Sequence, residues 1–152
     1  MLTAASLDPA AIAVDSPGPV LAFAAEELRS HLPPGSRQRD VAVRISSGDG
    51  DVDGFVVSVH DGDVAIRGGN PRGALNGAYW LLEQLGYAWV EPGDRGTRFV
   101  AGKSLAAGEY HETPAFPLRT LILGQDALHD DWPGWLEWAS RNRYNDIFFH
   151  DT

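Results

Sequence analysis

The stretch Gly68–Gly86, with the sequence GGNPRGALNGAYWLLEQLG, decides the fold class of this protein. It predicts a helix that follows the cap residue Asn70, has Pro71 in its first turn and stops at Gly86. One side of this helix is apolar, as on a helix that packs against a core. The apolar residues are Leu75, Ala78, Tyr79, Leu82 and Leu85.

Two glycines, Gly73 and Gly77, lie inside this helix and cost about 1 kcal/mol each relative to alanine. We expect a close approach of the helix to a sheet to offset that cost. The glycine cluster matches neither Gly-x-x-x-x-Gly-Lys-Ser/Thr nor Gly-x-Gly-x-x-Gly, the two common phosphate-binding motifs. A structural turn is therefore the favoured interpretation, and phosphate binding at the helix N-terminus is the alternative.

On the N-terminal side, a helix is expected at 19–32, because its apolar residues share one face and Pro19 suits a first turn. Alternating apolar and polar residues predict strands in this region. These strands are expected at 11–14, 41–46, 55–59 and 64–67. Asp61-Gly62 is a typical hairpin turn between the last two.

On the C-terminal side, short strands are expected at 87–90 and 98–100. A strand at 119–123, a helix at 132–143 and a strand at 146–149 then predict one β-α-β unit, which alone cannot cover both faces of its sheet. The residues at 101–117, between the short strands and this unit, are rich in Gly, Ala and Pro and show no helical or strand period. The predicted organisation is an α/β domain at 1–103, a linker at 104–117 and the β-α-β unit at 118–152.

Composition limits the function classes. The 152 residues are 43% hydrophobic, enough for one core or for a domain and a fragment. A net charge of −9 disfavours nucleic acid and anionic membranes as partners. The lack of cysteine excludes disulfides and thiolate chemistry. Residues 1–6 do not resemble a signal peptide, and no stretch is long and apolar enough to span a membrane. We expect a soluble chain, with its localisation open.

Four motifs together resemble known carbohydrate-cleaving enzymes. Ile66–Trp89 resembles the domain that precedes the catalytic barrel in family 20 β-N-acetylhexosaminidases and family 67 α-glucuronidases. Ala24–Leu28 resembles the first helix of that domain, and Glu112–Arg119 resembles the start of the barrel. Asn142–Asn145 with His150 resembles the passage from barrel helix one into strand two. The motifs keep the order found in those families.

The resemblance implies an α+β fold: a two-layer α/β sandwich with a mixed sheet and helices on one side, followed by an incomplete β-α-β start of a (β/α)8 barrel. In those families the front domain is not catalytic, and carboxyl groups deeper in the barrel, beyond this chain, perform hydrolysis. We therefore expect the non-catalytic N-terminal portion of a glycoside hydrolase, supporting a truncated barrel, with no catalytic residue and no cofactor. The expected partner is carbohydrate, bound through the full-length barrel.

Two alternatives stay open. The first is a stand-alone carbohydrate-binding module without catalysis. The second, less favoured, is a complete unrelated hydrolase that uses His129, Asp131 or His150.

Substrate meets a barrel at the C-terminal ends of its strands, which points to the segments 125–131 and 150–152. The resemblance implies that Arg119 matches a strand-one arginine that hydrogen-bonds sugar hydroxyls, and that His150 matches a position at the end of strand two. The plainer interpretations are an arginine paired with a carboxylate and a structural histidine. Residues 120–126 depart from the family 20 pattern, which leaves the substrate sugar open.

Five side chains near the C-terminus have the chemistry of metal ligands, but their spacing defines no site. They are His129, Asp130, Asp131, His150 and Asp151. We expect no metal here. We expect Asp130 and Asp131 to place negative charge at the N-terminus of the helix that follows, where the helix dipole favours it. As sequence neighbours, these two are also unsuited to straddle a glycosidic bond.

Three tryptophans, Trp132, Trp135 and Trp138, lie on the last predicted helix. Packing is favoured over sugar stacking for them, because a barrel helix buries its aromatic side chains. An incomplete barrel would leave some of this apolar surface exposed, which favours self-association.

Overall fold

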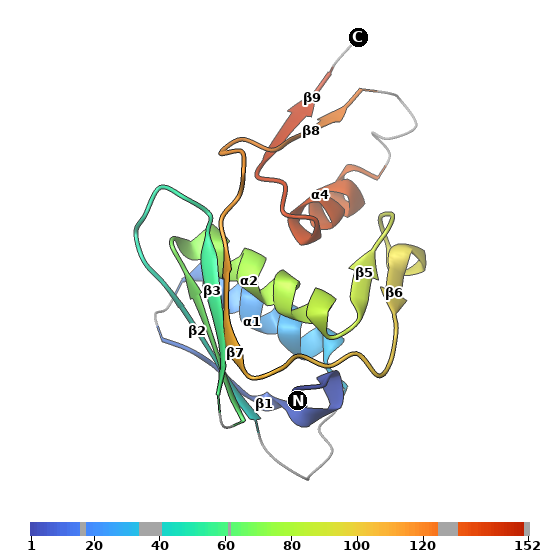
Figure 1. Cartoon of the computed structure of the whole chain (residues 1–152). Coiled ribbons are helices and arrows are strands. Elements are labelled where there is room, and N and C mark those ends of the chain that lie inside the picture. Colours follow the sequence, from blue (N-terminus) through green and yellow to red (C-terminus); the bar gives the residue numbers. More distant parts are fainter. Residues whose placement is uncertain (16–17, 34–40, 61, 125–130, 151–152) are drawn as a thin grey trace. The chain divides into compact units, whose positions relative to one another are not determined.

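The computed structural model describes residues 1–15, 18–33, 41–60, 62–124 and 131–150. The chain divides into two compact units (Figure 1). The first consists of Met1–Gly86 and Val100–Pro114, and the second of Tyr87–Phe99 and Ala115–Thr152.

The first unit contains a five-stranded mixed sheet. Its strand order is β1 (Leu7–Val14), β2 (Val41–Ser47), β4 (Asp63–Gly68), β3 (Phe55–His60) and β7 (Gly108–Glu112). The strands β1, β2 and β4 run parallel, whereas β3 is antiparallel to both of its neighbours. The predicted mixed sheet is confirmed.

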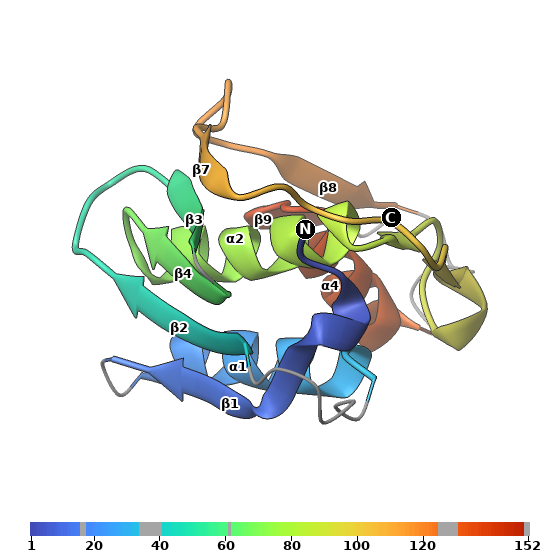
Figure 2. The same ribbon diagram turned by 60° about the horizontal axis from the view of Figure 1, so that its bottom comes forward.

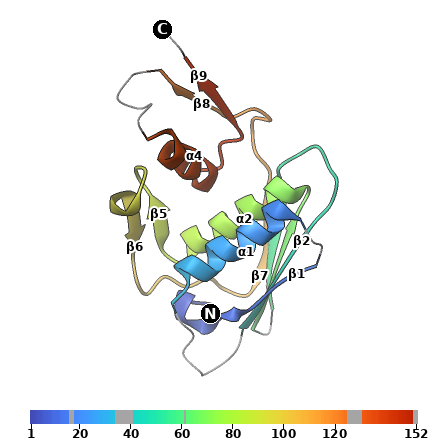
Figure 3. The same cartoon turned by 180° about the vertical axis from the view of Figure 1, so that it is seen from behind.

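Two helices, α1 (Pro19–His31) and α2 (Pro71–Gln84), lie side by side on one face of this sheet (Figures 1 and 3). Figure 2 shows β1, β2, β4 and β3 curving around the two helices. The core lies between these layers, where alternate strand residues meet the buried faces of the helices. Fully buried sheet residues include Val43, Ile45, Val57 and Ile66. The first unit is thus the expected two-layer α/β sandwich.

The two glycines inside α2 allow a close approach, as predicted. A Cβ atom on Gly77 would lie 2.7 Å from Cγ2 of Ile66 and 3.3 Å from the Phe55 ring. A Cβ on Gly73 would overlap the carbonyl oxygen of Gly54. The helix therefore packs with its backbone directly on the sheet and on the loop before β3.

The ends of α2 also follow the prediction. The Asn70 side chain accepts a hydrogen bond from the amide of Gly73, and Pro71 lies in the first turn. Gly86 has a φ of 114°, a left-handed conformation that favours glycine. The helix ends there because the chain turns away at a residue without a side chain.

The second unit contains the incomplete β-α-β start expected from the sequence. The strands β8 (Thr120–Leu123) and β9 (Asp146–Phe149) are parallel and in register. The helix α4 (Trp132–Arg141) lies between them in sequence, and Asp131 caps it by accepting a hydrogen bond from the amide of Gly134. This unit also contains a hairpin of β5 (Tyr87–Trp89) and β6 (Thr97–Phe99).

Two short 3-10 helices complete the described elements, η1 (Ala4–Ser6) before β1 and η2 (Asp94–Gly96) in the β5–β6 hairpin. Within the described part of the chain, no helix combines the length and the apolar character that crossing a membrane requires.

Three features differ from the sequence analysis. The segment expected to be a linker contains β7, an edge strand in which Tyr110 is the residue that packs inward, on Trp80. The first strand begins at Leu7 rather than at residue 11, because an edge strand tolerates Pro9. The hairpin Tyr87–Phe99, expected to belong to the front domain, groups with the second unit.

Candidate functional site

The carboxyl ends of β8 and β9 form the edge at which a barrel would meet its substrate. Leu123 lies opposite Phe149 in the register, so the two strands end together. Gly124 and His150 follow them, and the amide of His150 donates a hydrogen bond to the carbonyl of Leu123 at 2.9 Å. The backbone thus fixes the position of His150 at this edge.

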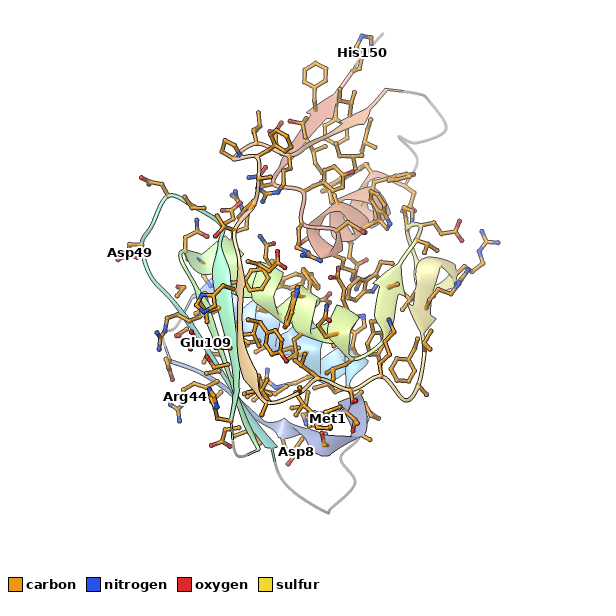
Figure 4. The ribbon with its side chains drawn as sticks, in the orientation of Figure 1. Met1, Asp8, Arg44, Asp49, Glu109 and His150 are labelled. Carbon is orange, nitrogen blue, oxygen red and sulfur yellow. The ribbon has the colours of Figure 1, made fainter. Side chains whose placement is uncertain are left out.

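The side chain of His150 is exposed at the end of β9 (Figure 4). Its ring lies edge-on to the ring of Phe148, with 6.5 Å between centroids. A Cβ atom on Gly124 would lie 3.4 Å from the Cβ of His150, so the glycine leaves room beside the imidazole. The imidazole can therefore reach a molecule outside this edge.

Arg119 lies at the opposite, amino end of β8, and its guanidinium contacts main-chain carbonyls. Its Nε donates to the carbonyl of Arg143 at 2.7 Å, and its Nη1 donates to that of Phe116 at 2.9 Å. Its own amide donates to Oδ1 of Asn145 at 2.8 Å. Arg119 therefore ties the segment before β8 to the turn before β9.

The structure does not bring Arg119 and His150 together. Four strand residues lie between the two positions, so they are five residue steps apart in the register, which at a rise of about 3.3 Å per residue is about 17 Å. Contact of either residue with a sugar stays a prediction.

The candidate metal ligands divide into two groups. His129, Asp130 and Asp151 lie outside the described residues. Asp131 caps α4, the helix-terminal role predicted for it, and His150 lies at the end of β9. Among residues that the structure describes, no three acidic or histidine side chains gather closely enough to hold a metal ion.

The N-terminus of α2 carries an internal anion. The carboxylate of Asp53 is 7% exposed and accepts a hydrogen bond from Nδ2 of Asn70 at 3.0 Å. It also pairs with Nη1 of Arg72 at 3.6 Å. The first turn of α2 therefore has an acidic partner from within the chain, and the two glycines inside the helix pack closely on Ile66 and Gly54, which supports the structural interpretation of the glycine cluster.

The outer face of the five-stranded sheet bears a polar depression that the sequence analysis missed. Its volume is about 250 Å³, and Arg44, Ser58, His60 and Asp63 line it over a floor of alanine side chains. Arg44 points away from the helix layer (Figure 4) and pairs with Asp15 at 3.0 Å. Polar residues at alternate positions of β2, β3 and β4 are the sequence signal for this face.

Comparisons with known proteins give a likeness of fold. The sequence matches no protein-family model and no curated protein sequence. Among the solved structures that match nearly the whole chain are the following three. The first is a GH138 enzyme targeting pectin rhamnogalacturonan II, with a TM-score of 0.68 and 15% identity over 92% of this chain.

The second is a GH115 4-O-methyl-α-glucuronidase with specificity for decorated arabinogalactans, with a TM-score of 0.62 and 13% identity over 99% of this chain. The third is the GH20 chitobiase of Flavobacterium johnsoniae, with a TM-score of 0.59 and 16% identity over 98% of this chain. This chain spans 18%, 25% and 24% of the three structures, respectively. In fold, the chain is therefore similar to one part of glycoside hydrolases from the families GH138, GH115 and GH20.

Proposed function

We propose that this chain is the non-catalytic N-terminal portion of a glycoside hydrolase and gives structural support to its barrel. The observation that carries the proposal is the fold match, which covers 92–99% of this chain but only 18–25% of each enzyme. The three matched enzymes have different substrates in their descriptions. What they share with this chain is thus a common part rather than a common specificity, which suits a supporting role.

The first unit would be the front domain, and the β8–α4–β9 unit would be the start of the barrel. A two-stranded parallel sheet with apolar residues on both faces is not stable alone. Ile122 and Phe148 lie opposite each other in the register and are 63% and 53% exposed. Further β-α units of a full-length enzyme would cover them.

The parent enzyme would act on a β-N-acetylhexosaminide or an α-glucuronide. In that enzyme, His150 would contact the sugar from the substrate edge of the barrel, and Arg119 would contact it from the amino end of β8, where two of its five guanidinium N–H groups bind main-chain carbonyls. The variant His150→Ala in the full-length enzyme is therefore expected to raise KM with little loss of stability. Arg119→Ala is expected to lower stability as well, because its bonds to Arg143 and Phe116 are lost.

The assay compares this chain with the full-length product of its gene on nitrophenyl N-acetylglucosaminide and nitrophenyl glucuronide. We expect turnover by the full-length protein and none by this chain. Robust turnover by this chain, abolished by His150→Ala, would instead favour the complete unrelated hydrolase.

A second candidate, a stand-alone carbohydrate-binding module, is supported by the depression on the outer sheet face. A guanidinium, an imidazole, a hydroxyl and a carboxylate around a shallow floor are groups that hydrogen-bond sugar hydroxyls. Calorimetric titration with N-acetylglucosamine and with glucuronic acid tests it. Heat that is lost in His60→Ala but kept in the control Lys103→Ala would support a binding module, and no heat at millimolar sugar would count against it.

A further inference from the structure

The β5–β6 hairpin interrupts the first unit in sequence but packs within the second unit. The chain leaves the first unit after Gly86 and returns to it at Val100. The amide of Val100 donates to the carbonyl of Gly86 at 2.9 Å, which closes the base of the hairpin. The strands Tyr87–Trp89 and Thr97–Phe99 pair over only three residues each. Such a short ribbon is marginal by itself in water.

The carbonyl of Trp89 attaches this hairpin to α4. It accepts a hydrogen bond from the indole Nε1 of Trp138 at 2.9 Å and another from Nδ2 of Asn142 at 3.2 Å. Both donors come from the helix and its C-terminal cap, and both are partly buried. Hydrogen bonds of this kind contribute about 1 kcal/mol each, and leaving such a buried carbonyl without a donor costs more.

The side chain of Trp89 strengthens the same attachment. It is 5% exposed, and the guanidinium of Arg141 lies 5.9 Å from the centre of its ring. Glu137 holds that guanidinium in place with an ion pair at 2.6 Å, one turn back along α4. A cation over an indole face is attractive, and more so where water is excluded.

We propose that the β5–β6 hairpin is a clasp: a segment that lies in sequence between the two parts of the first unit but folds as part of the second unit by docking on α4. The chain then crosses between the two units three times, after Gly86, after Phe99 and after Pro114. Three covalent connections thereby join the two units, instead of one linker. The proposal concerns the hairpin alone and does not depend on the parent being a glycoside hydrolase.

Native-state hydrogen exchange of the full chain tests the clasp. The probe is the amide of Val90, which donates to the carbonyl of Gly96 inside the hairpin at 3.0 Å. The variant Trp138→Phe keeps an aromatic ring but removes the indole donor. Its matched control is Trp135→Phe on the same helix, whose indole makes no hydrogen bond to any described residue. The amide of Leu85, which donates to the carbonyl of Leu81 in the first unit, reports on that unit.

We expect exchange at Val90 to become about fivefold faster in Trp138→Phe, the fold-change that one hydrogen bond of about 1 kcal/mol gives. Exchange at Leu85 should stay unchanged, and Trp135→Phe should affect Val90 less than Trp138→Phe does. If Trp138→Phe unfolds the chain, Asn142→Ala removes the second donor and should give the same pattern. Unchanged exchange at Val90 in both donor variants, or equal acceleration at Val90 and Leu85, would overturn the clasp.

Discussion

Replacing Gly77 by alanine tests why α2 carries glycine at its centre. In an exposed helix this change would stabilise by about 1 kcal/mol through helix propensity. Here the new Cβ would lie 2.7 Å from Cγ2 of Ile66 and 3.3 Å from the Phe55 ring. Ile66 is completely buried on a central strand, so its methyl group has no free space to move into.

Overpacking of a filled core costs about 1–3 kcal/mol, which exceeds the gain in propensity. We therefore expect Gly77→Ala to lower the free energy of unfolding by about 1 kcal/mol. Gly73→Ala should cost more, about 3 kcal/mol, because its Cβ would overlap a backbone oxygen that cannot rotate away.

The assay is urea unfolding followed by far-ultraviolet circular dichroism. The control is Gly18→Ala at the start of α1, where an added Cβ has no neighbour within 4 Å. Alanine is a weaker N-cap than glycine, but it also restricts the unfolded chain. These two effects on the free energy of unfolding should cancel to within about 0.5 kcal/mol. A Gly77→Ala variant that is more stable than the wild type by about 1 kcal/mol would refute close packing as the reason for this glycine.

Three further predictions concern single side chains. Asp53→Ala should lower the free energy of unfolding by about 2–3 kcal/mol, measured by urea unfolding, because a buried carboxylate that holds the N-terminus of α2 is lost. Burial raises the pKa of the Tyr87 hydroxyl above its ordinary 10.0, so the folded state disfavours the tyrosinate. The contribution of the protonated Tyr87 hydroxyl to folding stability is fully present below pH 10 and is lost as the pH rises through the raised pKa. Tyr87→Phe should therefore gain stability relative to the wild type only above about pH 10 in thermal unfolding, and a difference independent of pH would contradict this. Ile122→Lys should reduce self-association of this chain in sedimentation velocity, because Ile122 and Phe148 form an exposed apolar pair. Self-association that is absent in the wild type, or unchanged in the variant, would argue against this pair as the surface that associates.

The sequence predicts the parts of the fold that depend on local signals. The cap at Asn70, the stop at Gly86 and the buried side of α2 follow from residue types at fixed spacings, and the structure has all three. The close approach at Gly77 could also be anticipated, because helix interiors rarely keep glycine without a packing reason.

Other parts depend on contacts distant in sequence. The strand β7 has one inward aromatic residue, Tyr110, so its sequence shows no alternation of apolar and polar residues. Its pairing with β3 also joins segments about fifty residues apart in the sequence. Asp53 meets Asn70 only after the two loops fold together. The attachment of the hairpin depends on the main-chain carbonyl of Trp89, a group that every residue has.

The candidate site shows the same limit. The position of His150 at the carboxyl end of β9 follows from a strand predicted at 146–149. The bonds of Arg119 to the carbonyls of Arg143 and Phe116 could not be predicted, because they depend on how two turns meet at the amino end of the strands. The polar depression also needs the strand order β2-β4-β3, which residue alternation alone does not determine.

The mass of the native protein shows whether this chain is part of a larger glycoside hydrolase. Antibodies against this chain would isolate the gene product from its own cells, and mass spectrometry would measure its intact mass and its peptides. Because the chain spans 18–25% of the structures that it matches, we expect about four to six times the 16.4 kDa of this chain. Peptides beyond Thr152 should continue the β-α repeats and include a pair of acidic residues on a later strand. An intact mass of 16.4 kDa, with no peptide beyond Thr152, would contradict the account.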